Sequence, residues 1–220
     1  MRIVIAGGHG KIALRLERLL AARGDTPVGL IRNPDHAADV REAGAEPVVL
    51  DLEEATVTQL TEKVMGADAV VFAAGAGPGS GAARKATVDR DAARLLADAA
   101  SLAGVRRYIM VSAIAVDEGP PPDSEPVWAA YVEAKRAADD ELRRRSLETD
   151  WTILRPGRLT DGAGTGKVRL APKVERAEIP REDVAAVIAA LLDEPATIGR
   201  VLELVGGPTP IRDAVEAVGA

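Results

Sequence analysis

The chain has 220 residues, of which 47% are hydrophobic and 28% are charged, a balance that excludes a disordered or fibrous protein. Its formal net charge of −6 argues against binding to a phosphate backbone, so we expect no nucleic-acid partner. The absence of cysteine excludes disulfides and thiol chemistry, and two histidines do not provide a zinc ligand set, so no metal site is predicted.

Short apolar runs of strand length alternate with helical patterns from the first residue onward. Several runs are apolar throughout, as expected for strands that are covered on both faces. The alternation predicts one α/β domain with a Rossmann-like, doubly wound parallel sheet. Phe72, Tyr108 and Trp151 fall in these runs, where core packing explains them. The predicted strands are 2–6, 26–31, 46–50, 69–74, 107–112, 151–154 and 200–205.

Two segments interrupt this rhythm: the glycine-rich stretch 75–81 and the stretch 118–123, which holds three consecutive prolines. Each follows a predicted strand at its carboxyl end, the edge at which open α/β sheets bind ligands. They are either walls of a cleft or plain surface connections. The region of about 157–180 contains two further short strand candidates, and we interpret it as a small substrate-side insertion over the cleft.

No apolar run approaches the ~20 residues that a membrane helix needs, and the N-terminus lacks the apolar centre of a signal peptide. We therefore expect a cytoplasmic protein without a membrane partner.

A glycine cluster lies between the first predicted strand and the first predicted helix. Glycine permits the tight turn, and Gly10 allows the backbone to approach a pyrophosphate at the positive end of the helix. Lys11 either adds charge near the phosphates or is solvated. A triphosphate-binding loop is excluded, because Ile5 replaces its first glycine and Ile12 replaces its serine or threonine. The predicted dinucleotide contacts are Gly7, His9 through its backbone amide, Gly10, Lys11 and Ile12.

The second predicted strand ends where the adenosine ribose would lie. An NAD site normally places a carboxylate there, whereas a 2′-phosphate requires arginine. This sequence has Arg32, whose guanidinium can form two parallel bonds to a phosphate, so we predict NADP as the cofactor. Asp35 lies close enough in sequence to affect this preference.

Several short motifs occur in a characteristic order along nearly the whole chain. They are the glycine cluster 7–13, Arg32-Asn33-Pro34, Asp51-Leu52, Ala73-Ala74-Gly75, Val111-Ser112, Tyr131-Val132-Glu133-Ala134-Lys135 and Arg155-Pro156-Gly157. In this order they resemble the short-chain dehydrogenase/reductase superfamily, in particular its atypical group of NAD(P)-binding, NmrA-like and epimerase-like proteins. The resemblance implies that Asp51 and Leu52 flank the adenine. It also implies that Ala73, Ala74 and Gly75 lie beside the ribose and phosphates, and that Pro156 and Gly157 line the nicotinamide.

The candidate catalytic residues are Ser112, Tyr131 and Lys135. Tyr131 and Lys135 share a helix face, as does Trp128 one turn earlier. A phenol with a pKa of about 10 needs a neighbouring cation to act near neutrality, and Lys135 is predicted to supply it. In the family, the lysine also binds the nicotinamide ribose, the tyrosine protonates the substrate carbonyl and the serine orients it. Asp89 stands where classical members carry asparagine, which puts their proton relay in doubt.

These features favour an NADP-dependent oxidoreductase that acts on a small carbonyl, quinone-like or sugar-derived molecule. The alternatives are a non-catalytic NADP-binding regulator of the NmrA-like kind and a flavin or tetrapyrrole reductase that does not use Tyr131. The short remainder after Gly157 leaves little room for the substrate domain of an extended epimerase. We expect a monomer or a homodimer.

Overall fold

The computed structural model describes residues 1–77, 79–145 and 148–219; Pro78, in the glycine-rich stretch, lies outside the described residues. The strands are β1 Arg2–Ala6, β2 Thr26–Ile31, β3 Glu46–Val49, β4 Ala69–Phe72, β5 Arg107–Val111, β6 Asp150–Pro156, β7 Arg158–Thr160, β8 Lys167–Ala171, β9 Glu178–Pro180, β10 Arg200–Gly206 and β11 Thr209–Pro210. The main sheet has the order β11-β8-β10-β6-β5-β4-β1-β2-β3. From β3 to β10 in this order the strands pair in parallel, and β8 then pairs antiparallel with both β10 and β11.

This order is the Rossmann-like, doubly wound arrangement that the alternation of runs predicts. The chain leaves β1 for β2 and β3 and then crosses to β4 on the other side of β1. The direction of winding therefore reverses between β1 and β4, which is where such sheets bind their ligands.

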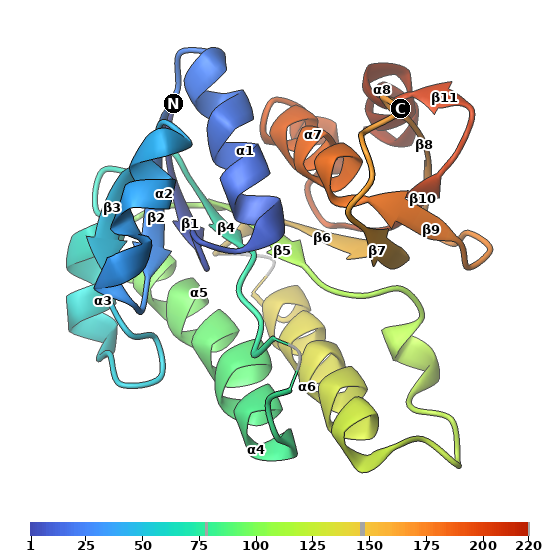
Figure 1. Ribbon diagram of the computed structural model, residues 1–220, viewed down its shortest axis with the longest axis horizontal. Helices are drawn as coiled ribbons and strands as arrows, with labels where there is room; N and C mark the ends of the chain where they lie inside the picture. The colour runs from blue at the N-terminus through green and yellow to red at the C-terminus, as the bar shows by residue number, and fades with distance from the viewer. Residues whose placement is uncertain (78, 146–147, 220) are drawn as a thin grey trace.

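Helices cover both faces of the sheet (Figure 1). The α-helices are α1 Lys11–Ala22, α2 Ala37–Glu42, α3 Val57–Val64, α4 Ala82–Arg84, α5 Ala92–Leu102, α6 Pro126–Arg143, α7 Arg181–Leu192 and α8 Ile211–Gly219. The shorter helical turns are η1 Pro34–His36, η3 Val116–Glu118 and η4 Pro195–Thr197, and η2 Lys85–Asp91 is a π-helix.

Alternate side chains of each inner strand enter two different cores, because successive residues of a strand point to opposite faces. Ile3 and Ile5 of β1 pack with α1 and α7, whereas Val4 belongs to the core under α3, α5 and α6. Phe72, Tyr108 and Trp151 are all buried in the second core, as their place in the apolar runs predicts. Burial on both faces explains why these strands are apolar throughout.

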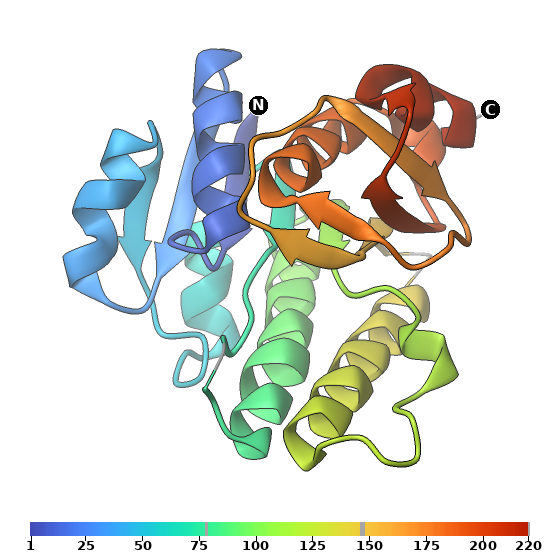
Figure 2. The same cartoon turned by 45° about the vertical axis from the view of Figure 1, so that its right-hand side comes forward.

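The structure differs from the predicted elements mainly at strand ends and in the C-terminal part. β4 ends at Phe72 and β5 at Val111, so Ala73, Ala74 and Ser112 lie in the loops that follow. The sequence did not predict β11 or the π-helix η2. In Figure 2 the segment with β7, β8 and β9, drawn in orange, lies above α6 and η3, drawn in yellow and yellow-green.

Candidate functional site

The glycine loop lies at the point where the winding reverses. Gly7 has a φ of 83°, and a Cβ there would lie 2.6 Å from the Cα of Ala74, so only glycine fits between the ends of β1 and β4. The Gly10 amide donates to the carbonyl of Gly7 at 2.7 Å, which closes the turn. Helix α1 then begins at Lys11. Its N-cap residue, Gly10, has no side chain to bond the first amides of the helix, and the first turn contains no acidic residue. The loop thus presents backbone amides at a positive helix end.

The side chains of His9 and Lys11 are engaged elsewhere. His9 Nε2 lies 2.7 Å from Asp39 Oδ2, and its ring stacks on His36 with centroids 3.6 Å apart. Lys11 Nζ donates to Asp161 Oδ2 at 2.6 Å, and its side chain is 65% exposed. The backbone of the loop is left as the ligand-facing surface.

Three charged side chains meet beyond the ends of β2 and β3. Arg32 Nη1 lies 3.1 Å from Glu53 Oε2, and Glu53 also accepts from Arg84 at 2.6 Å and from Thr87 at 2.7 Å. Hydrogen bonds from Arg84 and Thr87 lower the pKa of Glu53. Asp51 Oδ1 caps the same turn by accepting the Glu53 amide at 3.0 Å, beside Leu52. The sequence did not single out Glu53, although it directly follows the Asp51-Leu52 motif.

A buried carboxylate joins the loop after β4 to helix α6. Asp89 Oδ2 accepts the Ala76 amide at 3.2 Å, next to Gly75, and its Oδ1 lies 3.4 Å from Lys135 Nζ. Lys135 also donates to the carbonyl oxygen of Val111 at 3.0 Å, directly before Ser112. The structure therefore brings Gly75, Asp89, Lys135 and Ser112 into one cluster, with Asp89 serving as an ion-pair partner.

The environment of Tyr131 differs from the sequence-based prediction. Burial and the nearby carboxylates of Asp89 and Asp139 raise the pKa of the Tyr131 phenol, whereas Lys135 was expected to lower it. That expectation is wrong because Lys135 is directed at Val111 and Asp89. The cation at the Tyr131 ring is Lys85, whose Nζ lies 5.4 Å from the ring centroid. No spacing in the sequence indicates this neighbour, because Lys85 lies on η2 and Tyr131 on α6, far apart in the chain.

The end of β6 completes the site beside Ser112. The Ser112 amide donates to the carbonyl of Leu154 at 2.8 Å, and the carbonyl of Pro156 accepts from Ile114 at 3.0 Å. A Cβ at Gly157 would lie 2.1 Å from the carbonyl oxygen of Ala177. The backbone near the end of the 157–180 segment therefore packs directly on the glycine at its start.

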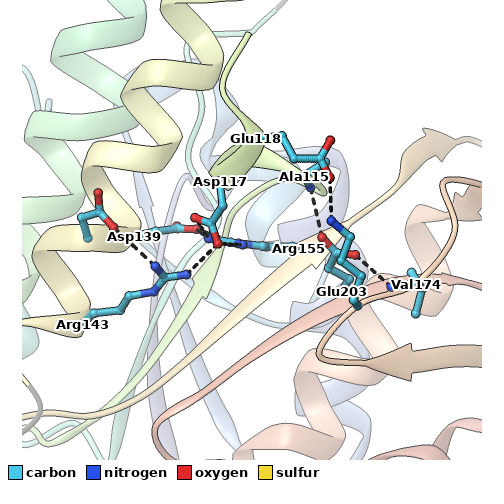
Figure 3. Close-up of polar contacts among 10 residues, drawn as sticks. Ala115, Asp117, Glu118, Asp139, Arg143, Arg155, Val174 and Glu203 are labelled. Atoms are coloured by element: carbon cyan, nitrogen blue, oxygen red, sulfur yellow. Dashed lines mark hydrogen bonds and ion pairs between the residues drawn. The ribbon is translucent and has the colours of Figure 1, made fainter. Parts of the chain in front are cut away.

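The loop after Ser112 is held by two buried charged side chains, Glu203 and Arg155 (Figure 3). Ala115 has a φ of 61°, and Glu203 accepts its amide at 3.2 Å and that of Val174 at 2.9 Å. Asp117 takes both guanidinium nitrogens of Arg155 at 2.7 and 2.8 Å, and these bonds lower the pKa of Asp117 to about 2. The η3 segment and the 157–180 segment are thus tied to neighbouring strands, β6 through Arg155 and β10 through Glu203.

The residues present fit a dinucleotide. The glycine loop provides close backbone approach and first-turn amides for a pyrophosphate, and the ends of β2 and β3 provide the charged turn at which an adenosine ribose would lie. The doubly wound sheet with this loop at its winding reversal defines a dinucleotide-binding protein of the Rossmann class.

Comparison with known proteins identifies the family. A model of the NAD(P)H-binding family matches residues 7–195, and the chain belongs to that family, within the atypical group related to short-chain dehydrogenases. Its relatives include proteins described as epimerases and as oxidoreductases. Among the residues that the structure describes, no helix has the length and apolar character needed to cross a membrane.

Three similar proteins illustrate this range. YhfK of Bacillus subtilis, called an uncharacterized sugar epimerase, is 35% identical over 217 residues, covering 98% of this chain and 99% of its own. A Bacillus halodurans structure, provisionally described as an NAD-dependent epimerase/dehydratase, has a TM-score of 0.89 and 39% identity, with 99% of each chain covered. ChuY, an anaerobillin reductase from Escherichia coli O157:H7, has a TM-score of 0.75 and 27% identity, covering 95% of this chain and 100% of its own.

Proposed function

We propose that the protein is an NADP(H)-dependent reductase of a small carbonyl, quinone-like or sugar-derived substrate. Arg32 is the observation that carries the cofactor preference. Its side chain is 55% exposed at the end of β2, and its one ion-pair partner among the described residues is Glu53. Because Arg84 and Thr87 also hold Glu53, Arg32 can turn to a 2′-phosphate without leaving that carboxylate unpaired.

The remaining cofactor contacts follow from the cluster at the sheet edge. The first-turn amides of Lys11 and Ile12 bind the pyrophosphate at the positive end of α1. Lys135 uses two contacts on Val111 and Asp89, and an ammonium has three donors, so one remains for a ribose hydroxyl. Pro156 and Gly157 line the nicotinamide side of the site.

Ser112 and Tyr131 serve the substrate. The bound nicotinamide supplies a hydride, and the chain must orient the carbonyl and protonate its oxygen. Ser112 orients the carbonyl, and the Tyr131 hydroxyl donates the proton. Because the pKa of Tyr131 is raised, the phenol remains protonated at neutral pH, which is the form that reduction needs.

A second candidate is reduction of a flavin or tetrapyrrole without proton transfer from Tyr131. The similarity to an anaerobillin reductase supports it, as does the exposed ring of Trp128, which is a suitable surface for a large flat substrate.

Calorimetry with NADPH and NADH tests the cofactor assignment. We expect NADPH to bind at least tenfold more tightly, equivalent to ~1.4 kcal/mol, and Arg32→Glu to abolish that preference. Arg212→Glu is the matched control, because it makes the same charge change on an exposed arginine of α8. Equal affinity for the two cofactors, or an unchanged preference in Arg32→Glu, would show that Arg32 does not read the 2′-phosphate.

Turnover of a panel of carbonyls, quinones and flavins tests the chemistry. We expect Tyr131→Phe to lower carbonyl reduction by ~10² or more while leaving NADPH affinity unchanged. Unchanged turnover in the variant would favour the flavin or tetrapyrrole reductase. Tight NADPH binding with no turnover in the parent would favour the non-catalytic regulator.

A further inference from the structure

An exposed tryptophan lies beside the proposed proton donor. Trp128 is 51% exposed, and its ring centroid lies 5.3 Å from that of Tyr131, with a tilt of 32° between the rings. The other tryptophan of the chain, Trp151, is buried in β6. A large exposed aromatic face next to a reactive group is a binding surface for another flat ring, because offset and tilted stacking stabilises such contacts.

A buried ammonium lies at the same tyrosine. Lys85 is 9% exposed, and its Nζ is 5.4 Å from the Tyr131 ring centroid. It donates one hydrogen bond, to the carbonyl oxygen of Gly77 at 3.1 Å, and no carboxylate within residues 1–77, 79–145 and 148–219 pairs with it. By contrast, Lys135, which is 4% exposed, has Asp89 within 3.4 Å.

A buried charge without a counterion is unfavourable unless another group compensates it. The carboxylate closest in sequence, Asp89, is already held by the Ala76 amide and Lys135. Two of the three ammonium donors of Lys85 therefore have no acceptor among the described residues. Lys85 also opens the π-helix η2, an element that occurs frequently at functional sites.

We propose that Trp128 and Lys85 select a substrate that is a flat conjugated ring bearing an oxyanion. The ring lies against Trp128 and Tyr131, and the carboxylate, sulfonate or phosphate pairs with Lys85. This assignment rests on the proposed reductase function and narrows its substrate class. In this proposal the anionic group of the substrate is the counterion of the buried Lys85 ammonium.

Matched ligand pairs test the two parts of the proposal separately. Riboflavin and FMN share one ring system and differ by a phosphate, and menadione and 1,4-naphthoquinone-2-sulfonate differ mainly by the anion. Affinities are measured by calorimetry on the NADP-loaded protein, where no turnover occurs. We expect wild type to bind the anionic member of at least one pair about tenfold more tightly than its neutral partner.

Substitutions at Lys85 then separate charge from structure. Lys85→Gln keeps an N–H donor for Gly77 and Lys85→Met removes it, so both should abolish the anion preference without changing the affinity for the neutral ring. Lys85→Arg should restore the preference. Trp128→Ala should weaken both members of a pair equally. Lys173→Gln is the control, because Lys173 is exposed and paired with Glu118 at 2.6 Å.

An anion preference that survives in Lys85→Gln, or a wild type that discriminates neither pair, overturns the proposal. Unchanged ring affinity in Trp128→Ala overturns the stacking part. NADPH affinity is measured on the same samples, so that this test can be distinguished from the test of the reductase proposal. Tight NADPH binding without a difference in affinity between anionic and neutral ligands refutes the substrate class alone. Absence of NADPH binding refutes the reductase.

Discussion

A buried carboxyl under the glycine loop offers a direct test of the electrostatics of this fold. Glu17 of α1 is fully buried, and neither of its carboxyl oxygens has a hydrogen-bond partner among the described residues. Glu17 Oε1 packs against two glycines. A Cβ at Gly29 would lie 2.7 Å from this oxygen, and a Cβ at Gly8 would lie 3.1 Å from it. Burial raises the pKa of Glu17 from 4.5 to about 8, with Arg18 opposing the shift.

The consequence for stability has a definite sign. Between pH 4.5 and 8 the folded protein holds a proton on Glu17 that the unfolded chain has lost, so the free energy of unfolding falls as the pH rises. The contribution is complete below pH 4.5 and is lost by about pH 8. At ~1.36 kcal/mol per pH unit, the loss between pH 5 and 7.5 is about 3 kcal/mol.

Glu17→Gln removes the titration while keeping the shape of the side chain. Urea unfolding followed by circular dichroism at pH 5, 6, 7 and 8 should show the variant gaining stability relative to wild type by about 3 kcal/mol over this range. Glu42→Gln, at the exposed end of α2, reports the same chemical change at the surface. Stability differences for Glu17→Gln that do not change from pH 5 to 8 would refute the reasoning.

Two further predictions concern the packing around the cleft. Gly157→Ala should destabilise the protein by more than ~2 kcal/mol, because its Cβ would lie 2.1 Å from a backbone oxygen, whereas Gly162→Ala, with nothing within 4 Å, should be nearly neutral in urea unfolding. Arg155→Met should cost ~3 kcal/mol, because it leaves the buried carboxylate of Asp139 without its guanidinium partner, while Asp117→Asn, at a half-exposed carboxylate, should cost ~1 kcal/mol or less. Equal losses in the members of either pair would contradict these assignments.

The sequence by itself determined the architecture. The alternation of strand-length apolar runs with helical patterns predicted the doubly wound sheet. Burial of a strand on both faces makes its residues apolar throughout, and this is visible in the sequence itself. The sequence also predicted the glycine loop between the first strand and the first helix. Gly7 is required by its positive φ, which a strand, a tight turn and a helix in immediate succession predict. The close approach of Ala74, from the loop after β4, is a tertiary contact that the local sequence does not indicate.

Only the tertiary structure decided which charges meet. Lys135 pairs with Asp89 and leaves the Tyr131 ring to Lys85, and Arg32 meets Glu53 from the turn after β3. Helical spacing predicted the shared face of Tyr131 and Lys135, but it carries no information about the groups that the neighbouring π-helix brings to that face. Long charged side chains choose partners by distance and burial, and those depend on segments far apart in the chain.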